Sequence, residues 1–251
     1  MALSSISSSD NIYYFRHRAR RRVLGFVRFV IVFYVIYQIV VTMLLSSYLV
    51  ESVSMAPRID PGDNLLVSPL VYGSRVPFTQ LRLPPIHRPR RGDVVLVRPN
   101  YAMLDPWYVR LADPVVRFFT GQRVGIGAQY RDRVGNTFVV KRVVGLPGDT
   151  LEIRDDAVYV KPAGSSVFSN ETELIHGNYE ITHAKLPKGW QADLPFSGNM
   201  APITMSGNEY FVIGDNRADS SDSSAWGPVK GDRIVGKVIF RYWPLKKLGV
   251  L

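Results

Sequence analysis

Two residues of the chain, Ser54 and Lys141, are of the types that together perform nucleophilic chemistry. A serine hydroxyl is a weak nucleophile at its own pKa, so a catalytic serine needs a neighbouring base to take its proton. A lysine amine becomes such a base where burial lowers its pKa from about 10.4, because loss of hydration disfavours the ammonium form. A fall of about three units would leave a substantial neutral fraction near pH 7. The pair therefore predicts acyl transfer by a serine with a lysine base.

The segment around Lys141 favours this interpretation. Residues 137–144 are mostly apolar and are expected to form a strand. The two-residue period of a strand puts Lys141 on the same face as Val139 and Val143, and Arg142 on the opposite face. Valine neighbours on that face would keep water away from the amine.

Each residue also has a simpler interpretation. An isolated lysine in a strand is usually an edge or surface residue that extends its amine to water. Ser52 and Ser54 could merely cap or turn the chain, since Pro57 and Pro61 follow them. The two residues become informative only together with further motifs.

Composition excludes several other kinds of chemistry. The chain has no cysteine, which excludes thiol catalysis, disulfides and cysteine-ligated metal. Its four histidines are scattered and show no paired metal-binding spacing. We therefore predict no metal and no cofactor. An apolar content of 46% in 251 residues is ample for a packed core.

The stretch before Ser54 is typical of a membrane span. Residues 29–49 carry no charged side chain, and at 1.5 Å per helical residue they reach across roughly 30 Å of hydrocarbon. Six arginines and a single acidic residue precede residue 29. This charge explains much of the net +10 and indicates a cytoplasmic end beside anionic lipid rather than nucleic-acid binding.

We therefore expect a loose basic cytoplasmic tail over residues 1–22, a transmembrane anchor over 23–50, and the remainder of the chain on the outer side of the membrane. A cleaved secretory signal is the alternative. The apolar run is longer than a usual signal core and has no clear small-residue cleavage site. A retained anchor is the favoured interpretation.

Beyond the anchor, the pattern is that of a mainly β protein. Short apolar runs bounded by Pro, Gly and Asp predict strands at residues 64–72, 93–98, 137–144, 149–154, 157–161, 210–213 and 234–243. Asp155 and Asp156 separate two of these runs and favour a tight hairpin. The expected catalytic β domain covers residues 51–161 and 209–251.

Two stretches look like insertions in this scaffold. Residues 101–136 combine aromatic and basic side chains, and could lie at the membrane surface near the site. A short helix that packs on the core is the simpler alternative. Residues 162–208 are rich in Gly, Ser, Pro and Asn and predict a small, loop-rich β subdomain.

Five motifs in order along the chain resemble those of the type I signal peptidases, membrane-anchored serine proteases that remove signal peptides from exported proteins. They are Ser-x-Ser-Met-x-Pro at 52–57, Arg-Gly-Asp-Val-Val at 91–95, Lys-Arg-Val-Val-Gly-Leu-Pro-Gly-Asp at 141–149, the segment that begins Gly-Asp-Asn-Arg at 214–227, and Gly-Lys-Val-Ile-Phe-Arg-Tyr-Trp-Pro at 236–244. No single motif is decisive, but their joint order is specific. The resemblance implies a coiled antiparallel β-sheet catalytic domain.

The resemblance also implies catalytic roles. Ser54 would be the nucleophile, and Lys141 the general base and later the acid for the departing amine. The backbone amide of Ser54 and the hydroxyl of Ser52 would form the oxyanion hole, where fixed donors hold the charge of the scissile carbonyl oxygen. Ser220 would orient the lysine amine by a hydrogen bond.

Supporting residues follow from the same comparison of motifs. Asp215 and Arg142 would form an ion pair, and a simple turn at Asp215 is compatible with that role. The family usually has arginine two residues after the loop aspartate, Asp222, but this chain has Ser224 there. Asp222 thus lacks its expected partner, and Arg217 is a hypothetical substitute.

The implied substrates are preproteins with small residues before the cut, processed at the outer face of a bacterial inner membrane in contact with lipid. Met55 and residues 65–67 are candidate pocket walls, or equally core. A self-cleaving repressor-type Ser/Lys protease is one alternative, but the membrane span stands where a DNA-binding domain would be. A catalytically silent adaptor that binds signal sequences is the other.

Overall fold

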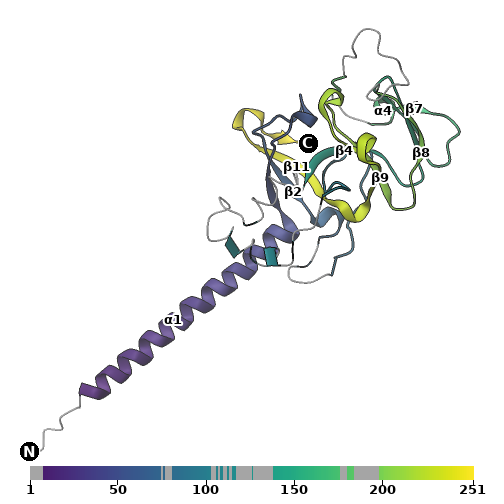
Figure 1. The fold of residues 1–251 in the computed structure, drawn as a ribbon. Coiled ribbons are helices and arrows are strands. Elements are labelled where there is room, and N and C mark those ends of the chain that lie inside the picture. The colour runs from purple at the N-terminus through teal and green to yellow at the C-terminus, as the bar shows by residue number, and fades with distance from the viewer. Residues whose placement is uncertain are drawn as a thin grey trace, which may run out of the picture.

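The long N-terminal helix leads into a β domain in the computed structural model (Figure 1). The structure describes residues 8–74, 76, 81–102, 106, 108–109, 112, 115–116, 126, 138–175, 180–183 and 198–251. Most of the first expected insertion, including Trp107, Phe118 and Phe119, lies outside the described residues.

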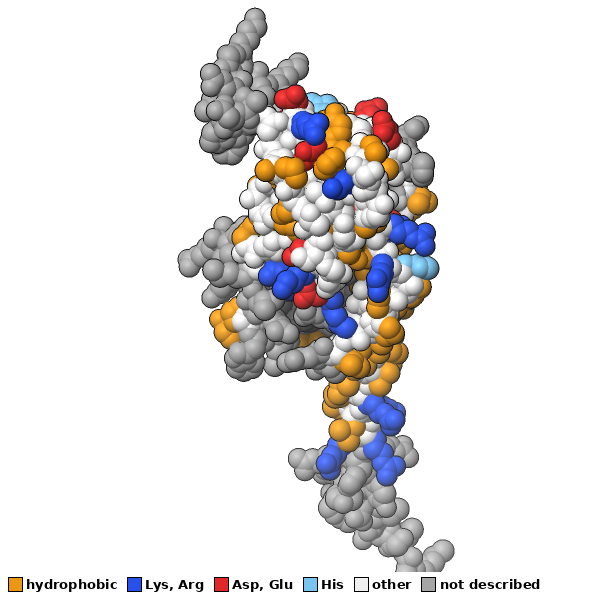
Figure 2. Space-filling model, turned by 90° about the vertical axis from the view of Figure 1, so that its right-hand side faces the viewer, with side chains coloured by type: hydrophobic (Ala, Val, Ile, Leu, Met, Phe, Trp, Pro, Cys, Tyr) orange, Lys and Arg blue, Asp and Glu red, His pale blue; other side chains and the backbone are white. Residues whose placement is uncertain are grey.

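Helix α1 (Ser8–Ile39) continues as one π-helical turn, η1 (Val40–Leu44). Residues 20–39 are long and apolar enough to cross a membrane. Most of their apolar side chains are exposed, and exposed arginines gather toward the N-terminal end of this stretch (Figure 2). One N-terminal apolar helix of this kind fits a single-pass membrane anchor.

The helix differs from the expected anchor at both ends. It starts at Ser8, within the residues expected to be a loose tail, and helical structure stops at Leu44 instead of continuing to residue 50. Residues Ser46–Leu49 form strand β1, which pairs antiparallel with β2. An uncharged run alone cannot distinguish the end of a span from an edge strand, because both are apolar.

One antiparallel sheet curls around the larger part of the domain, with strand order β1-β2-β11-β3-β4-β9-β10 and with β12 on β11 (Figure 1). Its other strands are β2 (Asn64–Ser68), β3 (Val94–Val97), β4 (Val139–Gly145), β9 (Glu209–Ile213), β10 (Val229–Lys230), β11 (Ile234–Trp243) and β12 (Gly249–Val250). The mainly β prediction is confirmed. The first predicted strand is too long, since Pro69 cannot donate to a ladder and the helical turn η3 (Leu70–Tyr72) follows it.

Both faces of this sheet are buried at its centre, along β3. On β3, Val94 and Leu96 enter one core cluster, whereas Val95 and Val97 enter another. This alternation explains an uninterrupted apolar strand, because a sheet covered on both sides needs apolar residues at every position. Lys141 stands opposite Val95 in the pairing of β3 with β4 and therefore lies deep within the sheet.

A second sheet of four strands has the order β7-β6-β5-β8. Its elements are β5 (Thr150–Arg154), β6 (Ala157–Lys161), β7 (Ser169–Asn170), β8 (Met200–Thr204) and the short helix α4 (Glu171–Leu174). Asp155 and Asp156 have φ of 51° and 62°, as a tight type I′ hairpin requires.

The sheets divide the chain differently from the expected boundary at residue 161. β5 and β6 pair with β7 and β8 in the small sheet rather than with the large sheet. The two sheets still share a core, in which Leu151 and Val160 pack with Val144 and Phe211. The small sheet thus packs against the end of β4, although its strands do not pair with β4.

Short helical turns lie between the strands and carry much of the candidate site. They are η2 (Val53–Met55), η4 (Arg217–Asp219), α5 (Ser223–Trp226), η5 (Gly231–Arg233) and η6 (Leu245–Lys247).

Candidate active site

Ser54 lies in η2, the turn that follows β1. Ser52 caps this turn, and its Oγ accepts a hydrogen bond of 3.2 Å from the backbone N–H of Ser54. The carbonyl oxygen of Ser54 accepts from the backbone N–H of Asn216 at 3.0 Å, and the Asn216 side-chain amide donates to the carbonyl of Val53 at 3.2 Å. The serine turn is therefore tied to the loop after β9.

Lys141 lies in β4 and is almost completely buried, with 2% of its surface exposed. Its Nζ donates a hydrogen bond of 3.0 Å to Ser220 Oγ. Burial lowers the pKa of Lys141 to about 8, although the carboxylates of Asp222, Asp215 and Asp219 act in the opposite direction. At that pKa about one amine in ten is neutral at pH 7, and half are neutral at pH 8.

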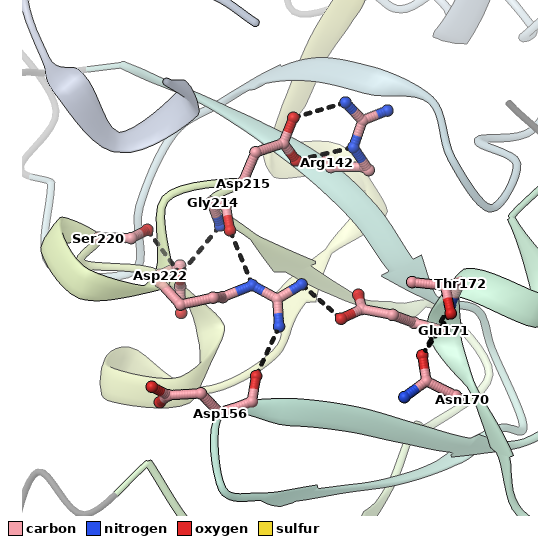
Figure 3. Close-up of polar contacts among 10 residues, drawn as sticks. Arg142, Asp156, Asn170, Glu171, Thr172, Gly214, Asp215, Ser220 and Asp222 are labelled. Carbon is pink, nitrogen blue, oxygen red and sulfur yellow. Dashed lines mark hydrogen bonds and ion pairs between the residues drawn. The ribbon is translucent and has the colours of Figure 1, made fainter. Parts of the chain in front are cut away.

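Ser220 is held in turn by Asp222 (Figure 3). Ser220 Oγ donates to Asp222 Oδ2 at 2.6 Å, and the backbone N–H of Gly214 donates to the same oxygen at 3.0 Å. Asp222 Oδ1 accepts from the N–H and the hydroxyl of Ser224, at 3.1 and 2.7 Å. The carboxylate is thus fully hydrogen-bonded. Asp222 caps α5, and Ser224 supplies two donors to it in place of the expected arginine.

Arg217 does not substitute for that arginine, so this hypothesis is wrong. Its Nη2 pairs with Glu171 Oε1 at 2.5 Å. Its Nε and Nη1 donate to the backbone carbonyls of Gly214 and Asp156, both at 3.0 Å. The hydroxyl of Ser224 already supplies the donor that Asp222 needs.

Gly214 lies where the serine turn meets the loop of residues 214–222 that follows β9. A Cβ at this position would lie 2.5 Å from the carbonyl oxygen of Ser54 and closer still to Ser220 Oγ, so only glycine fits without a shift. Ser220 Oγ is also the acceptor for Lys141. Among the described residues, no hydrogen bond joins the Ser54 hydroxyl directly to the Lys141 amine. Both groups instead lie next to the same two residues: Gly214 fits closely against Ser54 and Ser220, and Ser220 accepts the hydrogen bond from Lys141.

Arg142, the residue after Lys141 on β4, forms a buried ion pair with Asp215 (Figure 3). Two parallel hydrogen bonds of 2.8 and 2.6 Å join the guanidinium to the carboxylate. Arg142 Nη1 also donates to the carbonyl of Gly92 at 2.9 Å. A two-pronged contact of this kind fixes the geometry of the loop that starts at Asp215.

Among the described residues there is no group of three or more His, Asp and Glu side chains suited to a metal ion. The chemistry available from these side chains is proton transfer between a buried amine and hydroxyl groups.

A family model described as "Signal peptidase, peptidase S26" matches residues 23–243. The chain belongs to the signal peptidase family, peptidase S26.

Individual members of the signal peptidase family match parts of the chain. Signal peptidase IB of Staphylococcus aureus is 36% identical over 116 residues, which are 45% of this chain and 56% of that protein. The match therefore spans little more than half the length of that relative. Signal peptidase I of Leptolyngbya laminosa is 26% identical over 202 residues, 80% of this chain and 70% of its own. A crystal structure of a signal peptidase I from Enterococcus faecalis shows 24% identity and a TM-score of 0.30, and covers 61% of this chain and 98% of that one.

The structure of this signal peptidase family member places Met55 in the core. Met55 is 1% exposed and packs with Val50, Ile59 and Leu65. The core alternative therefore describes Met55 better than a pocket wall does, since a substrate would meet almost none of its surface.

Sequence reasoning missed two residues of the site. Gly214 matters for its lack of a side chain, and Asn216 binds the serine turn through its backbone and side chain. Both lie in a motif that was noticed. Their contacts with residues 53 and 54 depend on the fold and have no local signal in the sequence.

Proposed function

We propose that this protein is a membrane-anchored serine endopeptidase that removes signal peptides from exported preproteins at the outer face of a bacterial inner membrane. Family membership supports the reaction class. The observation that carries the mechanism is the buried Lys141 amine, which Ser220 holds beside the turn that contains Ser54. The Ser/Lys pair is the catalytic dyad of this proposal.

In the first half of the reaction, Ser54 Oγ forms a bond to the scissile carbonyl carbon. Neutral Lys141 takes the proton of the Ser54 hydroxyl in the same step. The hydrogen bond to Ser220 uses one N–H of the amine and leaves its lone pair available to Ser54. The tetrahedral intermediate then breaks its C–N bond, and the Lys141 ammonium gives its proton to the departing amine. The product is an acyl-enzyme on Ser54.

The oxyanion of this intermediate would be held by the N–H of Ser54 and the hydroxyl of Ser52. In the structure these two groups are bonded to each other, at 3.2 Å. A substrate oxygen would replace Ser52 Oγ as the acceptor for the Ser54 N–H, after which a rotation about the Ser52 side chain turns its hydroxyl toward the same oxygen. Such a donor commonly contributes about 3 to 4 kcal/mol to transition-state stabilisation.

Hydrolysis of the acyl-enzyme reverses these roles. Lys141 takes a proton from water, whose oxygen attacks the acyl carbon, and the proton then returns to Ser54 as the ester bond breaks. The enzyme regains its starting protonation state, and the steps use only side chains and water.

Membrane anchoring would bring the site to its substrates. The apolar helix and its exposed arginines support an N-terminus in the cytoplasm and a catalytic domain on the outer side. Since β1 joins the helix directly to the sheet that carries the site, the serine turn would lie close to the membrane surface, where signal peptides are held.

The test is cleavage of a preprotein by the detergent-solubilised full chain. Ser54→Ala and Lys141→Met should abolish cleavage, whereas Lys230→Met, at an exposed lysine, should leave the rate unchanged. Mass spectrometry of the product identifies the cut. An intact preprotein with the parent enzyme, or cleavage by either site variant, contradicts the proposal. Binding without cleavage would instead indicate a signal-sequence adaptor.

A further inference from the structure

A second charged group, outside the proposed dyad, links the small sheet to the loop of residues 214–222. The guanidinium of Arg217, in η4, contacts three parts of the structure. It donates to the carbonyl of Gly214 at 3.0 Å, to the carbonyl of Asp156 at the tip of the β5–β6 hairpin at 3.0 Å, and to Glu171 on α4 at 2.5 Å. Gly214 belongs to the site, whereas Asp156 and Glu171 belong to the small sheet and its helix.

The ion pair between Arg217 and Glu171 is deeply buried, with side chains 4% and 1% exposed. A buried ion pair is poor evidence of stabilisation, because removing two charges from water costs about as much as their attraction returns. Its fixed geometry can instead specify one arrangement of the chain. Glu171 is itself fixed, since Asn170 caps α4 by accepting from the N–H and hydroxyl of Thr172 (Figure 3).

The group that Arg217 holds is central to the site. The carbonyl of Gly214 accepts from Arg217, while its N–H donates to Asp222. The Cα of Gly214 also fits closely between the carbonyl oxygen of Ser54 and the hydroxyl of Ser220. A shift of this one peptide would move the acceptor of the Lys141 amine.

We propose that Arg217 is a positioning residue, through which the small sheet holds the loop of residues 214–222 against Lys141. This inference rests on the proposed function for its effect on catalysis. It gives the small sheet a role in the chemistry, although no residue of that sheet takes part in the reaction.

Loss of the Arg217 contacts should loosen the loop and admit water to the amine. The charged groups of this loop that act on the amine are Asp222, Asp215 and Asp219, whose carboxylates each favour its protonated form. Desolvation is the largest cause of the low pKa of Lys141, so hydration should return that pKa toward its ordinary value. Proton abstraction at neutral pH then becomes slower, while the binding of the peptide need not change.

Three variants of the full chain test this role. Arg217→Gln combined with Glu171→Gln removes both buried charges together, and so avoids leaving one unpaired. Arg217→Lys keeps a cation for Glu171 but cannot reach both carbonyls. Arg154→Ala is the matched control, because Arg154 pairs with Glu152 in the same small sheet but is 61% exposed.

The expected results are a kcat reduced by about 10- to 100-fold in the double variant, with KM little changed and with partial recovery in Arg217→Lys. The acid limb of the pH profile of kcat/KM should move upward by about one pH unit. Arg154→Ala should behave as the parent. A purely structural role would lower the melting temperature and leave the acid limb in place, and that outcome overturns the proposal.

A second readout does not depend on cleavage. In protein labelled with 13C at the lysine ε-carbon, the Lys141 signal is identified by its absence in Lys141→Met, and its titration reports the amine pKa directly. The pKa should rise in the double variant. If the parent fails to cleave, the proposed function fails while this titration still tests Arg217. If the parent cleaves and the titration is unchanged, only the Arg217 proposal is wrong.

Discussion

Replacement of Lys141 by methionine should make the folded protein more stable at neutral pH, although it should abolish catalysis. Folding buries the amine at 2% exposure, within a strand that packs on both faces. Water solvates the ammonium in the unfolded chain but not in the folded one. A methionine of similar length carries no charge that must be desolvated.

The size of the effect follows from the pKa of Lys141, which falls from 10.5 to about 8. This difference corresponds to a penalty of about 3 kcal/mol for folding with a protonated amine. Loss of the hydrogen bond to Ser220 should lower the unfolding free energy of the variant by about 1 kcal/mol. The methionine variant should therefore gain about 2 kcal/mol at pH 7.

The sign of the pH dependence follows from proton binding. The folded-state pKa is the lower one, so between about pH 8 and pH 10.5 the unfolded chain binds more protons than the folded chain. The stability of the parent rises with pH through this window. The advantage of the variant is fully present below pH 8 and disappears by about pH 10.5, where both states hold a neutral amine.

Urea unfolding between pH 6 and pH 10 measures this difference. Both proteins carry Ser54→Ala so that neither can cleave itself, and Lys230→Met serves as the control at an exposed lysine. The control should stay within about 0.5 kcal/mol of its parent. A Lys141→Met variant that is less stable at pH 7, or whose difference does not change with pH, would refute the reasoning.

Three further predictions concern the groups around the amine. Asp215→Asn leaves the Arg142 guanidinium buried without its counter-charge and should lower the unfolding free energy by about 3 to 5 kcal/mol; a loss under 1 kcal/mol in urea unfolding would contradict this. Ser220→Ala removes the acceptor of the Lys141 amine and, under the proposed mechanism, should reduce kcat by about 100-fold at unchanged KM, in steady-state cleavage of a preprotein. Ser224→Ala removes one donor to the buried Asp222 carboxylate and should cost about 1 to 3 kcal/mol, seen as a lower melting temperature; an unchanged melting temperature would mean that water replaces the hydroxyl.

Much of the fold could be predicted from local pattern. The β5–β6 hairpin was predicted at the right place, because Asp155 and Asp156 tolerate the positive φ that a two-residue turn needs. The hydrophobic pattern was misleading where a helix and a strand have the same apolar composition. The apolar run through residue 49 contains the end of a helix and an edge strand, and only pairing with β2 distinguishes them.

The assignment of strands to the two sheets could not be predicted from the sequence, for a related reason. Strand pairing depends on backbone partners that are distant along the chain, so β5 and β6 looked like a continuation of β4. Their pairing with β7 and β8, and the core that they share with β9, appear only in three dimensions.

For the site, the sequence by itself determined which residues are candidates for the chemistry: a serine after an apolar span, and a lysine among valines in a strand, within an ordered series of motifs. Tertiary structure alone decided how they are held. The contacts of Gly214 with Ser54 and Ser220, the pairing of Arg217 with Glu171, and the hydrogen bond from Ser224 to Asp222 all follow from burial and packing. The residue type determines which hydrogen bonds a side chain can make. The fold determines the partner, because a buried polar group must bond with whichever donor or acceptor packs against it.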